Sequence, residues 1–359
     1  MPDVISLCIG EPDFATPAPI AKAGFDAVYE VGIGYTANSG LPALRAKLAE
    51  HLARRYLVSY DPEGEIVITV GVSEAVKCVF TAICEPGDEI IVPEPCFVSY
   101  FPEVLFAGGT PVSVQCLERH GFEPLASQIE AAVTPKTKAI FLGYPNNPTG
   151  AVLTRANALA IAEVAKKHDL LVISDEIYDR LVYGTEHVCF SSLPGMKERT
   201  VLLGGFSKDY AMPGWRVGYM CGNRELMSAF LKVHQYAVMS APTISQFAAL
   251  EALRNGEKFV REMVEKYDNR RRLLVAGLND IGLDCFEPKG AFYAFPTVSS
   301  TGMNGDEFAE KLLIEKKVAV VPGSGFGSGG ENHVRIAYCK SYNQIETALQ
   351  RIREFVAEV

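Results

Sequence analysis

Long apolar runs are missing from this 359-residue sequence, and no stretch approaches the roughly 18 apolar residues that a membrane-spanning helix needs. No charged-then-apolar segment of the secretory type opens the chain. The nine cysteines are scattered without a C-x-x-C pair, which is typical of small core residues in a reducing compartment. The six histidines show no ligand spacing, so we expect no metal site and no disulfide framework. Together these absences predict a cytoplasmic protein.

Positive charge is also in short supply, with 34 Lys and Arg against 43 Asp and Glu and a formal net charge of −9. An acidic chain repels nucleic acid and anionic membranes, so we expect neither as a partner. Apolar residues make up 48% of the chain, and 19 Phe and 15 Tyr exceed what a solvated coil carries. The length allows one large domain and a second, smaller one, each with its own core.

Short apolar runs alternate with helical stretches between Glu65 and Gly222. This alternation predicts an α/β fold with a mostly parallel sheet covered by helices, since strands buried on both faces read as continuous apolar runs. The predicted strands are Glu65–Val70, Glu89–Val92, Ala139–Gly143, Leu171–Ser174, Thr200–Gly204 and Arg216–Cys221, and the predicted helices are Glu74–Cys84 and Arg155–His168. We place Gly108-Gly109 in a hairpin.

A polar helix over Glu257–Ile281 separates this region from a tail with shorter strands near Ala291–Phe295, Val318–Val321 and His333–Ala337. We therefore predict two domains built from three segments. Residues 1–18 join the small domain, residues 19–262 form the large domain, and residues 263–359 form the smaller α+β domain.

Polar groups follow several strand ends of the large domain, where ligands bind in sheets of this kind. Gly71-Val72-Ser73 lies between a strand and a helix start, whose N–H groups can hold a phosphate; an ordinary turn capped by Ser73 explains the same residues. Asp175 ends an apolar run, and a buried carboxylate requires a cationic or N–H partner. Asn147 and Lys208 follow two further strands, and Arg216 comes eight residues after Lys208. A lone lysine is usually a solvated charge, whereas one shielded among aromatics is a candidate Schiff-base amine.

Taken together, these groups match the phosphate, phenolic oxygen, ring nitrogen and aldehyde of pyridoxal 5′-phosphate. At this point the sequence resembles the class I pyridoxal-phosphate aminotransferases of fold type I. The resemblance extends from Gly10-Glu-Pro-Asp-Phe14 to Val334-Arg-Ile-Ala337 and is strongest to the microbial aspartate and aromatic aminotransferase branch.

The resemblance implies a role for each matching residue. Lys208 would form the covalent link to the cofactor and move the proton, and Asp175 would pair with the pyridinium nitrogen. Tyr178 and Asn147 would hydrogen-bond the phenolic oxygen. Arg335 would bind the substrate α-carboxylate, with Gly10 and Asn147 beside it. The other implied cofactor contacts are Phe97 stacked on the ring, Val72, Ser73, Ser207 and Arg216 at the phosphate, and Tyr35 reaching the phosphate from the neighbouring subunit.

The implied activity is transamination between an amino acid and a 2-oxo acid by a homodimer with shared active sites. Some microbial relatives bind a distal carboxylate with a lysine where this chain has Ser73, and the stretch Gln235–Gln246 carries no positive charge. We therefore expect neutral or aromatic substrates. The alternatives are an aspartate-preferring aminotransferase and a carbon–sulfur β-lyase on the same scaffold. A non-catalytic binding protein is a further alternative, against which the intact Lys208 argues.

Overall fold

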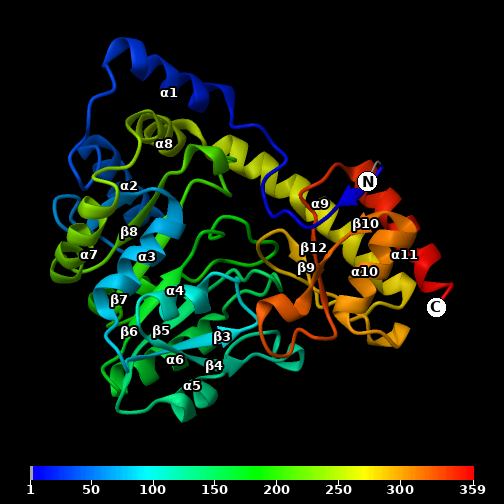
Figure 1. The fold of residues 1–359 in the computed structure, drawn as a ribbon. Coiled ribbons are helices and arrows are strands. Elements are labelled where there is room, and N and C mark those ends of the chain that lie inside the picture. Colours follow the sequence, from blue (N-terminus) through cyan, green and yellow to red (C-terminus); the bar gives the residue numbers. More distant parts are fainter. Residues whose placement is uncertain (1–2) are drawn as a thin grey trace.

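A computed structural model describes residues 3–359 and contains one large sheet with the strand order β2-β8-β7-β6-β5-β3-β4 (Figure 1). Its strands are β2 (Ile66–Thr69), β3 (Glu89–Glu94), β4 (Thr110–Gln115), β5 (Thr137–Gly143), β6 (Leu171–Asp175), β7 (Thr200–Gly205) and β8 (Gly218–Cys221). Strand β8 runs antiparallel to β2 and β7, and the other neighbouring pairs are parallel. The predicted mostly parallel α/β sheet is confirmed.

Helices cover both faces of this sheet, as strand β5 illustrates. Its Ile140 and Leu142 pack in a cluster with α5 and α6, whereas Ala139 and Phe141 pack in a cluster with α3, α4 and α7. Because successive side chains point to opposite faces of the sheet and both faces are covered, the side chains on both faces of the strand must be apolar. The helices of this part are α1 (Ala18–Glu30), α2 (Pro42–Tyr56), α3 (Gly71–Ile83), α4 (Tyr100–Phe106), α5 (Ala126–Ala132), α6 (Arg155–Lys167), α7 (Arg224–Ala237) and α8 (Thr243–Asn255).

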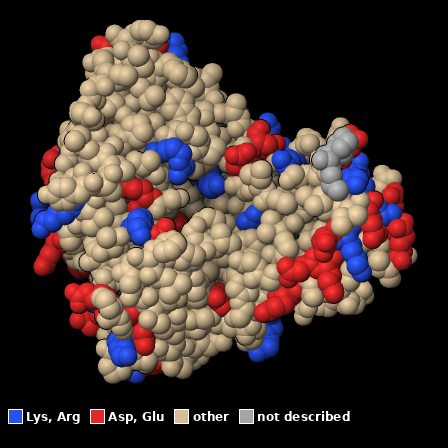
Figure 2. Space-filling model, viewed as in Figure 1, with Lys and Arg blue, Asp and Glu red and all other residues tan. Residues whose placement is uncertain are grey.

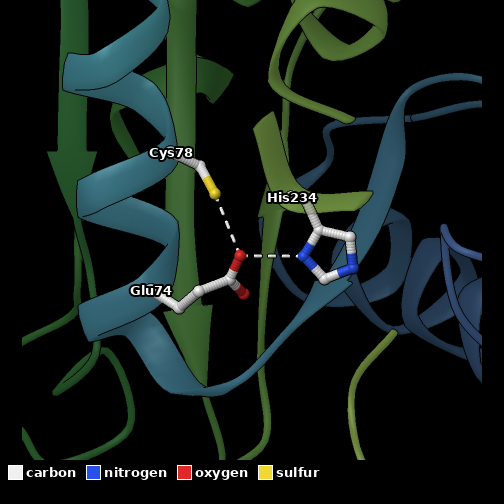
Figure 3. A group of neighbouring side chains, drawn as sticks. All are labelled: Glu74, Cys78 and His234. Atoms are coloured by element: carbon white, nitrogen blue, oxygen red, sulfur yellow. Dashed lines mark hydrogen bonds and ion pairs between the residues drawn. The ribbon is translucent and has the colours of Figure 1, made fainter. Parts of the chain in front are cut away.

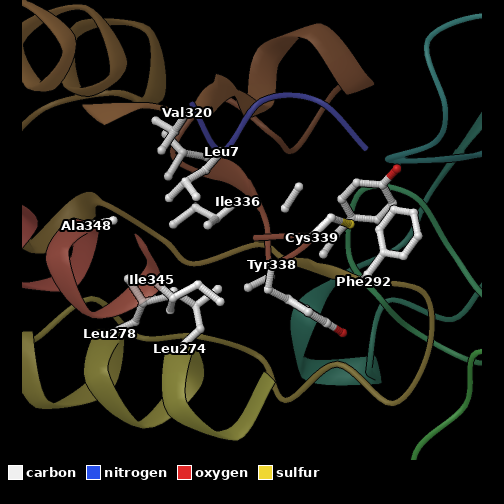
Figure 4. Packing of buried hydrophobic residues seen from close by; sticks show 14 of the residues in the cluster. Leu7, Leu274, Leu278, Phe292, Val320, Ile336, Tyr338, Cys339, Ile345 and Ala348 are labelled. Carbon is white, nitrogen blue, oxygen red and sulfur yellow. The ribbon is translucent and has the colours of Figure 1, made fainter. Parts of the chain in front are cut away.

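The long helix α9 (Glu257–Ile281) leads from the large sheet to a smaller α+β part in which both chain ends lie (Figure 1). Its other elements are β1 (Ile5–Ser6), β9 (Tyr293–Ala294), α10 (Gly305–Lys316), β10 (Val318–Ala319), β11 (Val321–Pro322), β12 (Val334–Ala337) and α11 (Tyr342–Val356). Strand β1 pairs in parallel with β10. Leu7 packs in the same core as Leu274 of α9 and Ile345 of α11 (Figure 4). A small second domain is confirmed, and the boundaries at residues 18/19 and 262/263 stay predictions.

Three local predictions were wrong. The strand predicted to start at Arg216 begins at Gly218, because Arg216 has the left-handed φ of 51°. The predicted strand Val318–Val321 is divided into β10 and β11, which pair with different partners. Gly108-Gly109 is not in a hairpin: it joins α4 to β4, and β4 runs parallel to β3. Across residues 3–359, no helix has both the length and the apolar character of a membrane span.

Candidate active site

A cavity of about 340 Å³ lies beyond the carboxyl ends of the parallel strands. In Figure 2 the molecule is hollowed between its two parts, with basic and acidic side chains at the rim. Of the residues predicted for the site, those lining this cavity are Gly10, Val72, Ser73, Phe97, Asn147, Asp175, Tyr178, Ser207, Lys208, Arg216 and Arg335. Tyr35 is the exception: its side chain is 85% exposed and is not part of the lining.

Lys208 follows strand β7 and extends towards the small domain. Its Nζ donates to the carbonyl oxygen of Gly10 at 2.7 Å and lies 5.8 and 5.7 Å from the ring centres of Tyr178 and Phe292. Burial lowers the pKa of Lys208, and the nearby guanidinium group of Arg216 acts in the same direction. A lowered pKa increases the fraction of neutral amine, which is the form that attacks an aldehyde.

Asp175 ends strand β6, and its two carboxylate oxygens face different donors. The Tyr100 hydroxyl donates to Oδ2 at 2.9 Å, and the Ile177 N–H donates to Oδ1 at 3.1 Å. Burial raises the pKa of Asp175 to about 6, although both hydrogen bonds act to lower it. The site therefore holds a carboxylate whose charge would be stabilised by a further cationic N–H, such as that of a protonated ring nitrogen.

Arg335 lies on strand β12 with its guanidinium group between two aromatic rings. Nη1 donates to Asn147 Oδ1 at 2.9 Å, and Nη2 donates to the Cys8 carbonyl oxygen. The guanidinium carbon is 4.6 Å from the ring centre of Tyr293 and 4.8 Å from that of Phe326. Nε is buried and has no partner among the described residues. A buried guanidinium with an unpaired donor is suited to a carboxylate ligand.

Two tyrosines that we did not assign from the sequence also line the cavity. Tyr293 lies 2.9 Å, hydroxyl to hydroxyl, from Tyr178, and Tyr100 contacts Asp175 as described above. Tyr293 also explains the glycine at position 10, because a Cβ there would lie 1.9 Å from the Tyr293 hydroxyl oxygen. Their roles come from contacts between distant segments. Tyr100 lies three residues after Phe97, which we did predict for the site, but nothing in the sequence singled out Tyr293.

The start of α3 forms a cradle for an anion together with Arg216. Helix α3 begins at Gly71, whose φ is +74° and where a Cβ would lie 2.7 Å from Arg216 Nη2. The N–H groups at the start of an α-helix have no partner within the helix and attract negative charge. Arg216 keeps its own position through a hydrogen bond from Nη1 to the Pro213 carbonyl oxygen at 2.9 Å. Ser73 and Ser207 add hydroxyl groups to the same lining.

A largely buried carboxylate, that of Glu74, joins the first turn of α3 to Cys78 and His234 (Figure 3). Glu74 Oε2 accepts from the Val70 N–H at 2.8 Å, while Oε1 accepts from Cys78 Sγ at 2.9 Å and from His234 Nδ1 at 2.8 Å. Burial acts to raise the pKa of Glu74, but the hydrogen bonds from His234 and Cys78 outweigh it and lower that pKa. The three ligand atoms lie within 4.8 Å of one another, as a metal site requires. Their direct hydrogen bonds instead favour a structural link between α7 and the start of α3.

These features fit pyridoxal phosphate. The cradle matches the phosphate, the Asp175 carboxylate matches a protonated ring nitrogen, and the shielded amine of Lys208 matches the aldehyde. Nη1 and Nη2 of Arg335 each carry a second N–H, and these remain for the carboxylate of a substrate.

Comparison with known proteins agrees with this fit. The family model described as "Aminotransferase class I and II" matches residues 2–352. The chain is 43% identical to an aspartate aminotransferase of Pyrococcus abyssi, over 100% of this chain and 93% of that protein. It is 40% identical to aromatic-amino-acid aminotransferase 2 of Thermococcus litoralis, over 99% of this chain and 92% of that protein.

A solved structure of an aromatic aminotransferase from Pyrococcus horikoshii superimposes with a TM-score of 0.97 at 41% identity, and the match covers 100% of this chain and 97% of the other. The structure of aspartate aminotransferase from Thermus thermophilus with maleate gives a TM-score of 0.94 at 40% identity, covering 98% and 91%. The chain belongs to the class I and II aminotransferases, which depend on pyridoxal phosphate.

Proposed function

We propose that this aminotransferase prefers neutral or aromatic amino acids as donors and transfers their amino group to a 2-oxo acid. The observation that carries the proposal is the small number of cations in the cavity. Among the described lining residues the cations are Lys208, Arg216 and Arg335. Lys208 reacts with the aldehyde of the cofactor, Arg216 binds its phosphate, and Arg335 binds the α-carboxylate of the substrate.

No lining cation is left for a second substrate carboxylate. Ser73 offers a hydroxyl group, and the lining also contains the acidic side chain of Glu103. Lys77 is outside the lining, and its Nζ lies 3.6 Å from Glu103 Oε2. A carboxylate moved into a buried site without a cation pays a large desolvation cost, so a dicarboxylic donor should bind poorly.

The proposed mechanism assigns roles to Arg335, Lys208, Asp175 and Tyr100. Arg335 binds the α-carboxylate through the second N–H groups of Nη1 and Nη2 and orients the substrate for reaction. The neutral amine of Lys208 would remove the proton from the substrate Cα and would return it during transfer. When bound, pyridoxal phosphate supplies an electron sink for the bond broken at Cα. Asp175 keeps the ring nitrogen protonated, and Tyr100 fixes the direction of that carboxylate.

We also propose a homodimer in which Tyr35 reaches the site of the second copy. An apolar surface, formed by the end of α1, the segment to α2 and the end of α7, supports this proposal. It includes Tyr29, Val31, Tyr35 and Tyr236, which are 88%, 66%, 85% and 86% exposed. Large apolar patches on a surface mark interaction sites. The Thr243 hydroxyl donates to the Gly34 carbonyl oxygen at 2.7 Å, which holds this segment against α8.

Steady-state kinetics with 2-oxoglutarate as the common acceptor test the substrate proposal. We expect kcat/KM for phenylalanine, tyrosine or alanine to exceed that for aspartate. A preference for aspartate would support the aspartate-aminotransferase alternative. Release of pyruvate and ammonia from a cysteine conjugate, without any 2-oxo acid, would support the β-lyase.

A further inference from the structure

A second cavity, of about 570 Å³, shares no lining residue with the active-site cavity, and we call it the rear cavity. It is bounded by the end of α2, the loop after β6 and the junction of α8 with α9. Three arginines line it: Arg54, Arg55 and Arg254. None of the three forms an ion pair with a carboxylate among the described residues; the ion pairs at this cavity join Arg180 to Glu257 and His187 to Glu176. The transamination mechanism uses none of them.

The charges of the rear cavity favour an anion. Its acidic lining residues are Glu186 and Glu257, and both oxygens of Glu257 accept from Arg180 Nη2, at 2.8 and 2.9 Å. Arg180 therefore already neutralises the charge of Glu257. Glu186 is the remaining acidic residue of a lining that contains three arginines. The lining also contains His187, whose Nε2 contacts the buried Glu176. The lining thus carries an excess of positive charge that is not satisfied within the chain.

His51 provides a second, independent observation. Its side chain lines the rear cavity, is only 7% exposed, and makes no hydrogen bond with any described residue. Both ring nitrogens lie outside the set of fully enclosed, unpartnered atoms, so they are reached from the cavity. Burial lowers the pKa of His51 to about 4, and Arg180 and Arg55 act in the same direction. The neutral ring therefore offers one N–H donor towards the cavity.

From these contacts we propose that the rear cavity binds a small oxyanion, a phosphate group or a carboxylate-bearing metabolite, between Arg54, Arg55, Arg254 and His51. Arginine guanidinium groups bind planar or tetrahedral oxyanions through paired N–H donors. The site adjoins the active site without overlapping it. Tyr56 donates to Asp179, the residue after Tyr178, and His187 contacts Glu176, the residue after Asp175.

Isothermal titration of the holoenzyme tests the proposal, with inorganic phosphate and citrate as separate probes and KCl at constant ionic strength. Bound cofactor fills the cradle at α3, so phosphate cannot report on that site. We expect saturable binding of at least one probe, and the two probes distinguish a phosphate site from a carboxylate site. The double variant R54Q/R254Q should weaken the affinity for the bound probe about tenfold or more. The variant H51Q should weaken this affinity to a smaller extent.

The matched control is R261Q/R353Q, which removes the same charge at two exposed arginines outside the rear cavity. Binding by this control should equal that of the parent. The proposal is overturned if neither probe binds saturably, or if R54Q/R254Q and R261Q/R353Q bind equally well. Circular dichroism and the cofactor absorption band verify that each variant is folded and loaded.

Discussion

The Tyr100 hydroxyl lies 2.9 Å from Asp175 Oδ2, and no other described side chain donates to this carboxylate. The hydroxyl acts to lower the pKa of Asp175, but burial raises that pKa to about 6. The apoprotein thus holds this proton far more tightly than an unfolded chain would. Ionisation of Asp175 therefore lowers the stability of the folded apoprotein. A cationic ring nitrogen facing the carboxylate would stabilise the ionised form.

The first prediction follows from this pKa. Because the folded pKa is raised, the native apoprotein binds more protons than the unfolded chain between about pH 4 and pH 6, and its unfolding free energy falls as the pH rises through that window. Asp175→Asn should remove this component. Relative to the parent, the variant gains about 1 kcal/mol of stability between pH 5 and pH 7. Urea unfolding of both apoproteins measures the difference, and parallel pH profiles would disprove the assignment.

The second prediction concerns Lys208. Borohydride reduction of the holoenzyme followed by peptide mapping should place the pyridoxyl label on Lys208, the lysine that lines the cavity. Lys208→Ala should retain the cofactor through the cradle while losing turnover by several orders of magnitude, because both the covalent link and the proton carrier are gone. A label on any other lysine contradicts the assignment.

A third prediction addresses the link between Glu74 and His234. Glu74→Gln and His234→Asn should weaken binding of pyridoxal phosphate to the apoprotein by about tenfold, since each change disrupts the hydrogen bond between the Glu74 carboxylate and His234. Binding of pyridoxal, which lacks the phosphate, should change by less than about twofold. Cys78→Ala is the matched control, because it removes only the weaker thiol contact. Equal losses for both ligands would mean a general structural role.

The fourth prediction tests the shared site. Tyr35→Ala and Lys208→Ala should each be poorly active, and mixing the two should restore part of the activity, because one of the mixed sites would carry both residues. Analytical ultracentrifugation should show a dimer for the parent. A monomer with full activity would contradict the proposal of a shared site.

Much of the fold and of the site could be predicted because the signals are local. The continuous apolar runs marked the buried strands. Asp175 is the last residue of β6, and Lys208 lies three residues after the end of β7. Contacts between distant segments could not be predicted in the same way. The link from Glu74 to His234 joins residues 160 positions apart, and the contact of Tyr178 with Tyr293 joins residues 115 positions apart. The prediction of a strand at Arg216 was wrong for the same reason. The left-handed φ of this residue is set by the tertiary turn, and an arginine has no preference of its own for that conformation.

The central claim is that a missing cation sets the substrate class, and Ser73→Lys tests it most directly. The added amine would enter the lining beside the cradle and could pair with a distal carboxylate. The measurement is the ratio of kcat/KM for aspartate to kcat/KM for phenylalanine, in the parent, in Ser73→Lys and in the uncharged control Ser73→Gln. We expect the parent and the control to favour phenylalanine, and Ser73→Lys to shift the ratio towards aspartate by about tenfold or more. A parent that already favours aspartate would contradict the claim.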